Sequence, residues 1–285
     1  MTPIPERVQT WLEKNGYGAV VSSQAASGGC INNGVVLATT TGDTVFLKTN
    51  RHAPPSMFAR EWEGLAALRV EGGPTVPRAL LQGDAFLLLE DLSPAPRCAG
   101  YWATFGRQLA TLHTYTNHQF GFSHDNYIGS TPQPNPWTED GYLFFAEQRL
   151  EFQAHLARER GLLSLADAKK VKNIAHRLED LIPDQPASLI HGDLWSGNAI
   201  TDAQGAPAII DPAAHYGWPE AELAMTSLFG TFPREFYYAY QEIRFLEPEY
   251  RDRFPLYNLY HLLNHLNLFG TGYLRQVRSV IGQFE

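Results

Sequence analysis

Cysteine and long hydrophobic runs are scarce in this chain of 285 residues. Cys30 and Cys98 are its only cysteines, too few for the disulfide framework of a secreted scaffold, which favours a reducing compartment. No window approaches the ~18 apolar residues of a membrane helix, and residues 1–18 contain no continuous apolar segment typical of a secretion signal. We therefore expect a cytoplasmic protein with no membrane partner.

Positive charge is scarce as well. The sequence has 22 Lys and Arg against 30 Asp and Glu, which gives a net charge of -8 at pH 7. Because there is no basic run, the chain lacks the electrostatic footprint of a nucleic-acid-binding protein. These charges also argue against a polyanionic substrate, so we expect a small molecule.

One stretch carries most of the functional information. His191-Gly-Asp193-Leu-Trp-Ser-Gly-Asn198 is followed by Asp211 at the end of a short apolar run. This order and spacing, H-x-D-x(4)-N and then a strand-borne Asp, is typical of protein-kinase-like enzymes that transfer a phosphoryl group. The alternative is an ordinary turn, because Gly, Asp and Asn are common turn residues. The complete set in this order favours an enzyme.

Each polar side chain of this motif has a predicted task. Asp193 is the expected base, since a carboxylate on such a loop can take the proton of the attacking hydroxyl. Asn198 and Asp211 offer oxygen ligands that suit Mg²⁺. His191 is expected to orient the loop rather than to transfer a proton.

The hydrophobic periodicity predicts an α+β, protein-kinase-like fold with two lobes. The first is a small antiparallel β-sheet lobe with one main helix; we expect helices at 6–15 and 56–70, the latter capped by Ser56, and strands at 19–23, 34–39, 44–48 and 86–89. The larger lobe is mostly helical, with helices at 101–113, 137–160, 164–180 and within 219–280, and short strands at 188–190, 199–200 and 208–210. The break at 93–96 sets the predicted domains at 1–92, which binds nucleotide, and 93–285, which carries the catalytic and acceptor-binding residues.

Two features of the small lobe are predicted to bind the phosphates of ATP. Lys48 ends a strand, where its ammonium can reach the phosphates if a helix carboxylate holds it. Glu61 is the expected carboxylate, with Glu63 as the alternative. Gly28 and Gly29 allow the backbone to approach phosphates closely, although a plain hairpin turn has the same composition.

The end of the small lobe is the expected hinge. Glu90, Asp91 and Leu92 follow an apolar strand and precede a proline-rich break. At this place main-chain groups can face an adenine ring, and the alternative is a simple linker between lobes.

The sequence resembles the fructosamine kinase family, within the aminoglycoside and choline kinase-like group. Trp195-Ser196-Gly197, between the Asp and the Asn of the motif, sets this family apart from its relatives. The resemblance implies a kinase that uses ATP and Mg²⁺ to phosphorylate the sugar 3-hydroxyl of a fructosamine or ribulosamine, and a role in deglycation of amines or proteins. It covers nearly the whole chain and is carried by residues 28–32, 46–48, 61–65, 105–113, 120–135, 191–198, 211–217, 223–230 and 262–265.

The acceptor site is predicted beside the catalytic loop. A sugar-amine acceptor needs aromatic surface and a carboxylate for its amine, and Trp195, Trp218 and Glu220 are close in sequence. Core packing is the alternative for both tryptophans, and Trp218 stands where many relatives have His or Asp. His261 and His265 stand four apart on a predicted helix, a zinc-like spacing, but packing or acceptor contact is the favoured interpretation.

Three questions stay open at this level. The same chemistry would serve a kinase of choline, homoserine or an aminoglycoside, and a non-catalytic nucleotide-sensing protein is the alternative outside enzymes. A thiol at Cys30, within a phosphate-binding loop, suggests redox control of ATP binding, while a small buried residue is the plainer interpretation. The chain is expected to be a monomer or a homodimer.

Overall fold

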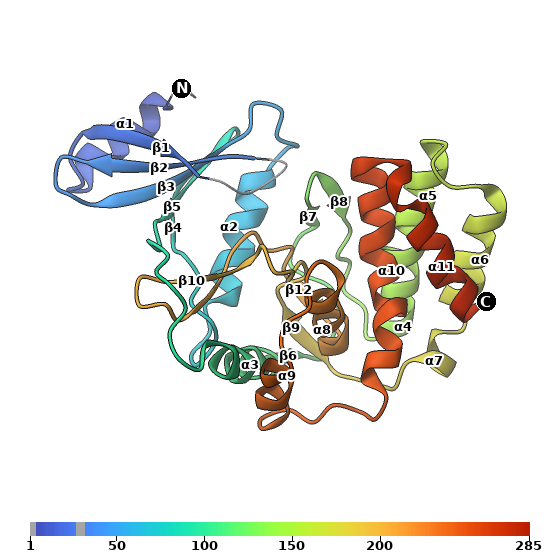
Figure 1. The fold of residues 1–285 in the computed structure, drawn as a ribbon. Helices are drawn as coiled ribbons and strands as arrows, with labels where there is room; N and C mark the ends of the chain where they lie inside the picture. Colours follow the sequence, from blue (N-terminus) through green and yellow to red (C-terminus); the bar gives the residue numbers. More distant parts are fainter. Residues whose placement is uncertain (1–3, 27–31) are drawn as a thin grey trace.

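The computed structural model describes residues 4–26 and 32–285. Figure 1 shows an N-terminal part built on a sheet and a larger, mostly helical C-terminal part. The sheet has five antiparallel strands in the order β1-β2-β3-β5-β4. The elements of this part are α1 (Glu6–Lys14), β1 (Val20–Ala25), β2 (Asn33–Thr39), β3 (Thr44–Thr49), α2 (Met57–Leu68), β4 (Ala79–Gly83) and β5 (Phe86–Glu90).

The strand β5 is buried on both faces and separates two cores. Phe86 and Leu88 pack with Val8 and Leu12 of α1, whereas Leu87 and Leu89 belong to the large core that includes α2. Alternation along a strand explains this division, because successive side chains point to opposite faces. The two helices therefore cover opposite faces of the sheet.

The C-terminal part combines helices with very short strands. Its elements are α3 (Tyr101–Leu112), β6 (Thr116–Asn117), β7 (Asn126–Ile128), β8 (Thr131–Gln133), α4 (Gly141–Phe145), the π-helix η1 (Ala146–Glu151), α5 (Phe152–Glu159), α6 (Leu165–Ala175), α7 (Leu178–Leu181), β9 (Ala187–Ile190), β10 (Ala199–Thr201), β11 (Pro207–Ile209), β12 (His215–Gly217), α8 (Pro219–Leu228), α9 (Arg234–Gln241), α10 (Tyr250–Phe269), the 3-10 helix η2 (Thr271–Tyr273) and α11 (Leu274–Phe284). The strands form a sheet β12-β9-β6 and the hairpins β7-β8 and β10-β11.

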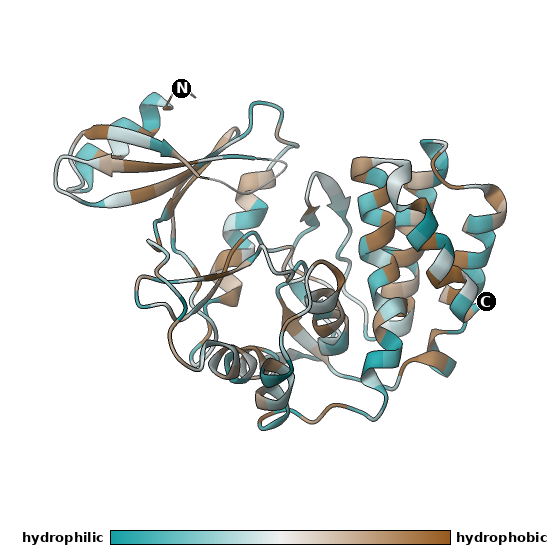
Figure 2. Cartoon of the chain, viewed as in Figure 1, coloured by the Kyte–Doolittle hydropathy of each residue, from teal (hydrophilic) through white to brown (hydrophobic). Residues whose placement is uncertain are grey.

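The helices of this part share one hydrophobic core. Leu256, Leu259 and Leu263 of α10 are fully buried with Leu223 of α8 and Leu150 of η1. Figure 2 shows apolar and polar residues interleaved along these helices, as expected when one face is packed and the other is wet. No described helix is long and apolar enough to cross a bilayer.

The structure differs from the sequence-based prediction at several element ends. Ser56 precedes α2, but its φ is 61° and its side chain makes no capping bond, so the predicted cap is wrong. The helix expected from residue 137 begins at Gly141, where the Asp140 carboxylate accepts a bond from the Leu143 amide at 2.9 Å. The sheet ends at Glu90, and the domain division at residues 92 and 93 stays a prediction.

Candidate active site

Lys48 lies on the sheet face that α2 covers. It pairs in register with Leu87, which faces α2, while its neighbour Leu47 faces α1. This register directs the Lys48 side chain towards α2. Its Nζ lies 2.5 Å from Glu61 Oε1 and 2.5 Å from Asp211 Oδ1. Charged groups from both parts of the chain therefore meet at one point.

The surroundings of Lys48 keep its amine charged. Burial opposes the charged form, but the carboxylates of Asp211 and Glu61 outweigh burial and raise the pKa of Lys48. Glu63, the alternative partner, is bonded instead to Arg60 at 2.7 Å. The structure thus brings Lys48 to Glu61 rather than to Glu63.

The loop after β9 contains two further polar residues of the motif. Asn198 Nδ2 donates to the Asp193 backbone oxygen at 2.8 Å and lies 3.4 Å from the Asp193 carboxylate. The Ile210 amide donates to the Asn198 backbone oxygen at 3.1 Å, which joins the loop to the segment that carries Asp211. The side-chain contacts of Asn198 use its Nδ2 atom. Its side-chain oxygen Oδ1, the atom that suits a cation, takes no part in them.

Asp193 and Asp211 are the two acids of the motif, and the charge of Asp211 acts on Asp193. Burial raises the pKa of Asp193 well above its usual range, and the charges of Asp211 and Glu222 add to this increase. Asp211 has a φ of 60°, a left-handed conformation that Asp tolerates and that is frequent at functional sites. Within the described part of the chain, no three His, Cys, Asp or Glu side chains form a metal site. A cation here would rely on Asp211, Asn198 and the oxygens of a bound phosphate.

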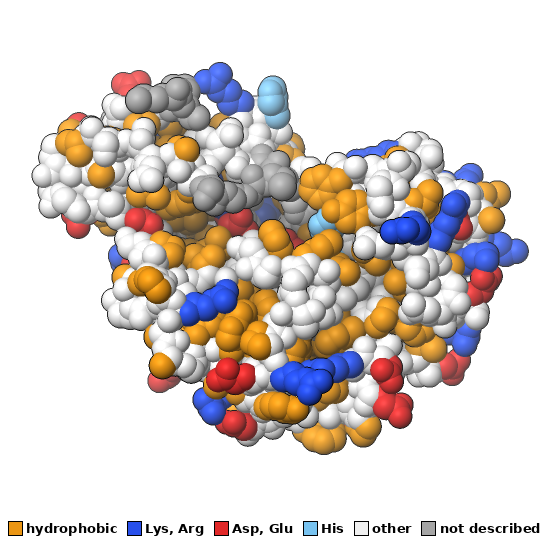
Figure 3. Space-filling view, viewed as in Figure 1, with side chains coloured by type: hydrophobic (Ala, Val, Ile, Leu, Met, Phe, Trp, Pro, Cys, Tyr) orange, Lys and Arg blue, Asp and Glu red, His pale blue; other side chains and the backbone are white. Residues whose placement is uncertain are grey.

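Figure 3 shows a groove between the two parts of the molecule, with acidic and basic side chains inside it. His191 supports the loop that carries Asp193 through both nitrogens of its ring. Its Nε2 lies 2.8 Å from the Ile210 oxygen, and its Nδ1 lies 3.2 Å from the Asp193 amide. Because an amide can only donate, Nδ1 accepts and Nε2 carries the proton. Burial lowers the pKa of His191, and both ring nitrogens contact the backbone, which fits an orienting role.

Glu222, which the sequence-based prediction left out of the site, fixes this loop. Its buried carboxylate accepts bonds from the amides of His191 at 2.6 Å and Gly192 at 2.9 Å, and His113 Nε2 lies 3.3 Å away. Burial opposes ionisation, but the bonds from His113 and His191 outweigh it and lower the pKa of Glu222. The sequence alone did not distinguish Glu222 from Glu220, the other acid in the first turn of α8.

Buried amides of the β7-β8 hairpin hold the segment after Asp211. Asn126 donates to the Ala214 oxygen at 2.8 Å, and Gln133 donates to the Ala213 oxygen at 3.0 Å. Gln133 also donates to Asn126 Oδ1 at 2.7 Å. Both side chains lie in the stretch 120–135 that carries part of the family resemblance. In the structure this stretch supports the backbone beside Asp211. The sequence did not suggest this function.

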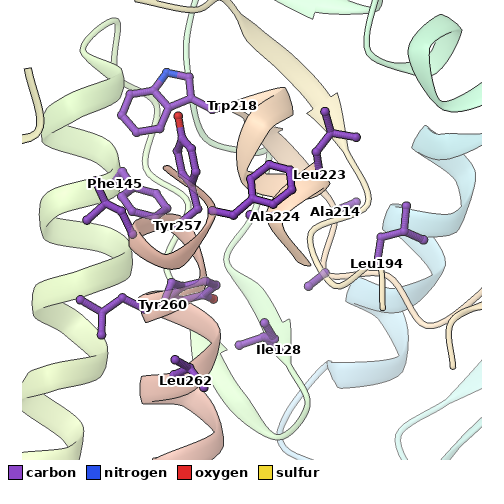
Figure 4. Packing of buried hydrophobic residues seen from close by; sticks show 14 of the residues in the cluster. Ile128, Phe145, Leu194, Ala214, Trp218, Leu223, Ala224, Tyr257, Tyr260 and Leu262 are labelled. Atoms are coloured by element: carbon purple, nitrogen blue, oxygen red, sulfur yellow. The ribbon is translucent and has the colours of Figure 1, made fainter. Parts of the chain in front are cut away.

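The two predicted acceptor tryptophans have different surroundings. Trp195 is 36% exposed on the loop that carries Asp193. Trp218 is 3% exposed and packs in the core, with ring centroids 5.4 Å from Phe145 and 6.1 Å from Tyr257 (Figure 4). Core packing, the alternative interpretation, therefore applies to Trp218, while Trp195 is open to an acceptor.

Glu220, the predicted acid of the acceptor site, is buried in an ion pair. Its carboxylate is buried and pairs with Arg253 Nη2 at 2.6 Å and with the Tyr257 hydroxyl at 3.2 Å. The negative charge of this buried acid is already balanced by the positive charge of Arg253. The structure gives Glu220 a place in an ion pair instead of a contact with substrate.

Two predicted nucleotide-binding segments remain. Gly28 and Gly29, together with Cys30, lie outside the described residues, so the interpretations given to them stay predictions. Glu90 is the last residue of β5, and residues 90–92 lie where the chain leaves the sheet for the helical part. Their use as an adenine-binding hinge also stays a prediction.

Buried histidines make the stability of the protein depend on pH. Burial lowers the pKa of His261 to about 3, whereas an unfolded chain titrates near 6.5. Below about pH 6.5 the unfolded state therefore binds more protons, and stability falls as the pH falls towards 3. Between about pH 4 and 5.5, His261→Gln should reduce the slope of unfolding free energy against pH by about 1.4 kcal/mol per pH unit.

Urea unfolding at a series of pH values measures this slope. The exposed His155 of α5 provides the matched control variant, His155→Gln, which replaces an imidazole that is not buried. A slope that is the same in His261→Gln and in the unaltered chain would contradict the expectation.

Nearly the whole chain matches one known family. The fructosamine kinase model matches residues 5–284. The chain belongs to the fructosamine kinase family. A Synechocystis sp. protein named as a ketoamine kinase is 44% identical over 266 residues, which cover 91% of this chain and 89% of that protein. A chloroplastic protein-ribulosamine 3-kinase of Oryza sativa subsp. indica is 37% identical over 289 residues, which cover 97% and 83%.

Solved structures of this family have the same fold. A Thermobifida fusca protein named as a fructosamine-3-kinase superposes with a TM-score of 0.87 at 32% identity, covering 96% of this chain and 97% of that one. A choline kinase of Streptococcus pneumoniae has a TM-score of 0.67 at 15% identity, covering 98% and 99%, a likeness in fold alone. The predicted family, the kinase-like fold and the assignment as a phosphotransferase with an alcohol acceptor are confirmed.

Proposed function

We propose that this fructosamine kinase family member transfers the γ-phosphoryl group of ATP to the 3-hydroxyl of a ketoamine, either a fructosamine or a ribulosamine. The observation that carries the proposal is the meeting of Lys48, Asp211, Asn198 and Asp193 at the junction of the two parts. Relatives named as ketoamine kinase and protein-ribulosamine 3-kinase support the acceptor class. The implied role is the removal of sugar from glycated amines.

Each residue of the site has its own role in the transfer of the phosphoryl group. Lys48, held by Glu61, binds the phosphates of ATP. Asp211 and Asn198 would hold Mg²⁺, which would neutralise charge on the triphosphate. Asp193 takes the proton of the acceptor hydroxyl while the oxygen bonds to the γ-phosphorus, the bridging P–O bond breaks and ADP leaves. The burial and neighbouring charges that raise the pKa of Asp193 favour its acceptance of a proton.

The rest of the nucleotide site belongs to the N-terminal lobe, residues 1–92. In this proposal Gly28 and Gly29 bring backbone amides to the phosphates, and the main chain of residues 90–92 meets the adenine. Trp195 offers its exposed ring to the acceptor. The acceptor is a small glycated amine or the same adduct on a protein.

An acceptor panel tests the proposed function. ADP formation by the purified chain is measured with fructosyl-lysine, ribulosyl-lysine, choline, homoserine and an aminoglycoside, each with Mg²⁺ and with a chelator. We expect turnover with the ketoamines alone, and only with Mg²⁺. Turnover of choline, homoserine or the aminoglycoside in place of ketoamines would overturn the acceptor assignment. A complete lack of turnover would favour a non-catalytic nucleotide-binding protein.

A further inference from the structure

A buried arginine lies at one end of the network that holds the segment after Asp211. Arg149 is 1% exposed and belongs to the π-helix η1, a rare type of helix that is frequent at functional sites. Its Nη1 donates to the Pro134 oxygen at 2.7 Å, and its guanidinium lies 4.4 Å from the centroid of the Phe144 ring. In the part of the chain that the structure describes, no carboxylate forms an ion pair with Arg149.

The charge of Arg149 is unfavourable in this place. Burial lowers the pKa of Arg149 to about 10, so the guanidinium is still charged at pH 7. Well-packed apolar side chains of similar volume are often more stable in a core than buried charges. What arginine offers here, and an apolar side chain does not, is a set of hydrogen-bond donors.

Three buried amide side chains connect Arg149 to the backbone after Asp211. Arg149 Nη2 donates to Asn135 Oδ1 at 2.7 Å, and Asn135 Nδ2 donates to Asn126 Oδ1 at 3.0 Å. Asn126 and Gln133 then donate to the backbone oxygens two and three positions after Asp211. We call Asn135, Asn126 and Gln133 the amide relay. Their exposed fractions are 2%, 4% and 1%, so the relay is shielded from solvent.

The arginine fixes the direction of the amide relay. An amide group can be turned round, which exchanges the place of its donor with that of its acceptor. A guanidinium has donors alone, so Asn135 must present its oxygen to Arg149 and its nitrogen to Asn126. Asn126 must then present its oxygen to Asn135 and its nitrogen to the Ala214 oxygen. The donor that Ala214 needs is therefore determined by the cation at the other end of the relay.

The backbone at the end of the relay begins with a residue in an uncommon conformation. Asp211 has a φ of 60°, and a residue keeps such a conformation only where its surroundings hold it. The relay holds the carbonyls of Ala213 and Ala214, and the Ala213 amide donates to the His191 oxygen at 2.9 Å. If the relay were lost, the Asp211 carboxylate would be less firmly placed.

We propose that Arg149 is a positioning residue for the cation that Asp211 and Asn198 would hold. Arg149 itself contacts neither of these residues; it acts through the amide relay on the backbone that carries Asp211. The inference rests on the proposed function, because it concerns the metal site assigned there. It adds that the affinity for the metal depends on the orientation of three buried amides.

Asn135→Asp tests this inference with almost no change in the shape of the side chain. The carboxylate gives Arg149 a charged partner, but it cannot donate to Asn126. We expect Asn126 to turn its nitrogen towards the new acid, which removes its bond to the Ala214 oxygen. The apparent Kd for Mn²⁺, measured by electron paramagnetic resonance with a non-hydrolysable ATP analogue, should rise about tenfold, a usual effect of groups that orient metal ligands. Hydrogen exchange of residues 211–216 should become faster.

Two changes at Arg149 and a control complete the experiment. Arg149→Met removes the donors and should also weaken Mn²⁺ binding about tenfold, whereas Arg149→Lys retains a cation with donors alone and should recover most of the affinity. Asn173→Asp, at an exposed position of α6, should leave the Kd for Mn²⁺ and the exchange unchanged. Thermal unfolding of each variant shows whether it is folded.

The possible outcomes separate this inference from the proposed function. If Asn135→Asp binds Mn²⁺ and exchanges hydrogen like the unaltered chain, the inference is overturned and the proposed function stays in place. A loss of Mn²⁺ affinity in Arg149→Met that is absent from Asn135→Asp would also overturn it, because Arg149 would then act through packing alone. Absence of Mn²⁺ binding by the unaltered chain would overturn the proposed metal site and this inference together.

Discussion

Asp193→Asn is expected to lower kcat by about 10²- to 10⁴-fold while the Kd for ATP stays within about twofold. The amide has the shape of the carboxylate but cannot accept the proton of the attacking hydroxyl. The contacts that join Lys48 to Glu61 and Asp211 do not involve Asp193, so the phosphate-binding part of the site is preserved. Single-turnover phosphorylation and ATP titration separate the two effects.

Asp180→Asn is the matched control for this variant. Asp180 is exposed on α7, and its carboxylate has no hydrogen-bond or ion-pair partner within the described residues. Its replacement should leave kcat and ATP binding as they are. Full kcat in Asp193→Asn would mean that another group takes the proton, and a large loss of ATP affinity would place Asp193 in the nucleotide site instead.

Glu222→Gln is expected to destabilise the protein by about 1–3 kcal/mol, the usual cost of leaving a buried hydrogen-bonding group without its partner. A carboxylate accepts from the amides of both His191 and Gly192, whereas an amide has one acceptor oxygen and sets its own N–H groups against the second amide. The loop that carries Asp193 should lose its fixed position, so kcat should fall more than the affinity for ATP.

Urea unfolding and steady-state kinetics check both parts of this expectation. Glu139→Gln, at an exposed position before α4, should change neither stability nor kcat. Glu222→Asp retains the charge and should give an intermediate result. If Glu222→Gln were as stable and as active as the unaltered chain, the carboxylate would not be the support of the catalytic loop.

The parts of the site that sequence analysis predicted are those with local periodicity or fixed spacing. Glu61 was distinguished from Glu63 because residues two apart on a helix lie about 200° apart, and the structure joins Glu61 to Lys48. The spacing from His191 to Asn198 likewise indicated a single loop, and Asn198 bonds the backbone of Asp193. In both cases a local rule determines where the side chain lies.

The sequence is uninformative where long-range packing decides the direction of a side chain. Trp218 is near the motif in sequence, but it follows β12, whose pairing with β9 leads it into the core. Glu220 meets Arg253, 33 positions later in the chain, on another helix. Neither partner is visible in the local pattern.

Short elements were missed for a related reason. The strands β7 and β8 have three residues each, too few to show alternation. Their buried Asn126 and Gln133 look like ordinary loop residues in sequence. Only the fold shows that these amides hold the carbonyls of Ala213 and Ala214.

The position of the transferred phosphate tests the central claim most directly. The purified chain is incubated with MgATP and fructosyl-lysine, and the product is examined by two-dimensional ³¹P–¹H NMR. The account predicts one phosphate per ADP formed, with the phosphorus coupled to the proton on C3 of the sugar. Phosphorus coupled to a different position, or ADP formed without a phosphorylated ketoamine, would contradict it.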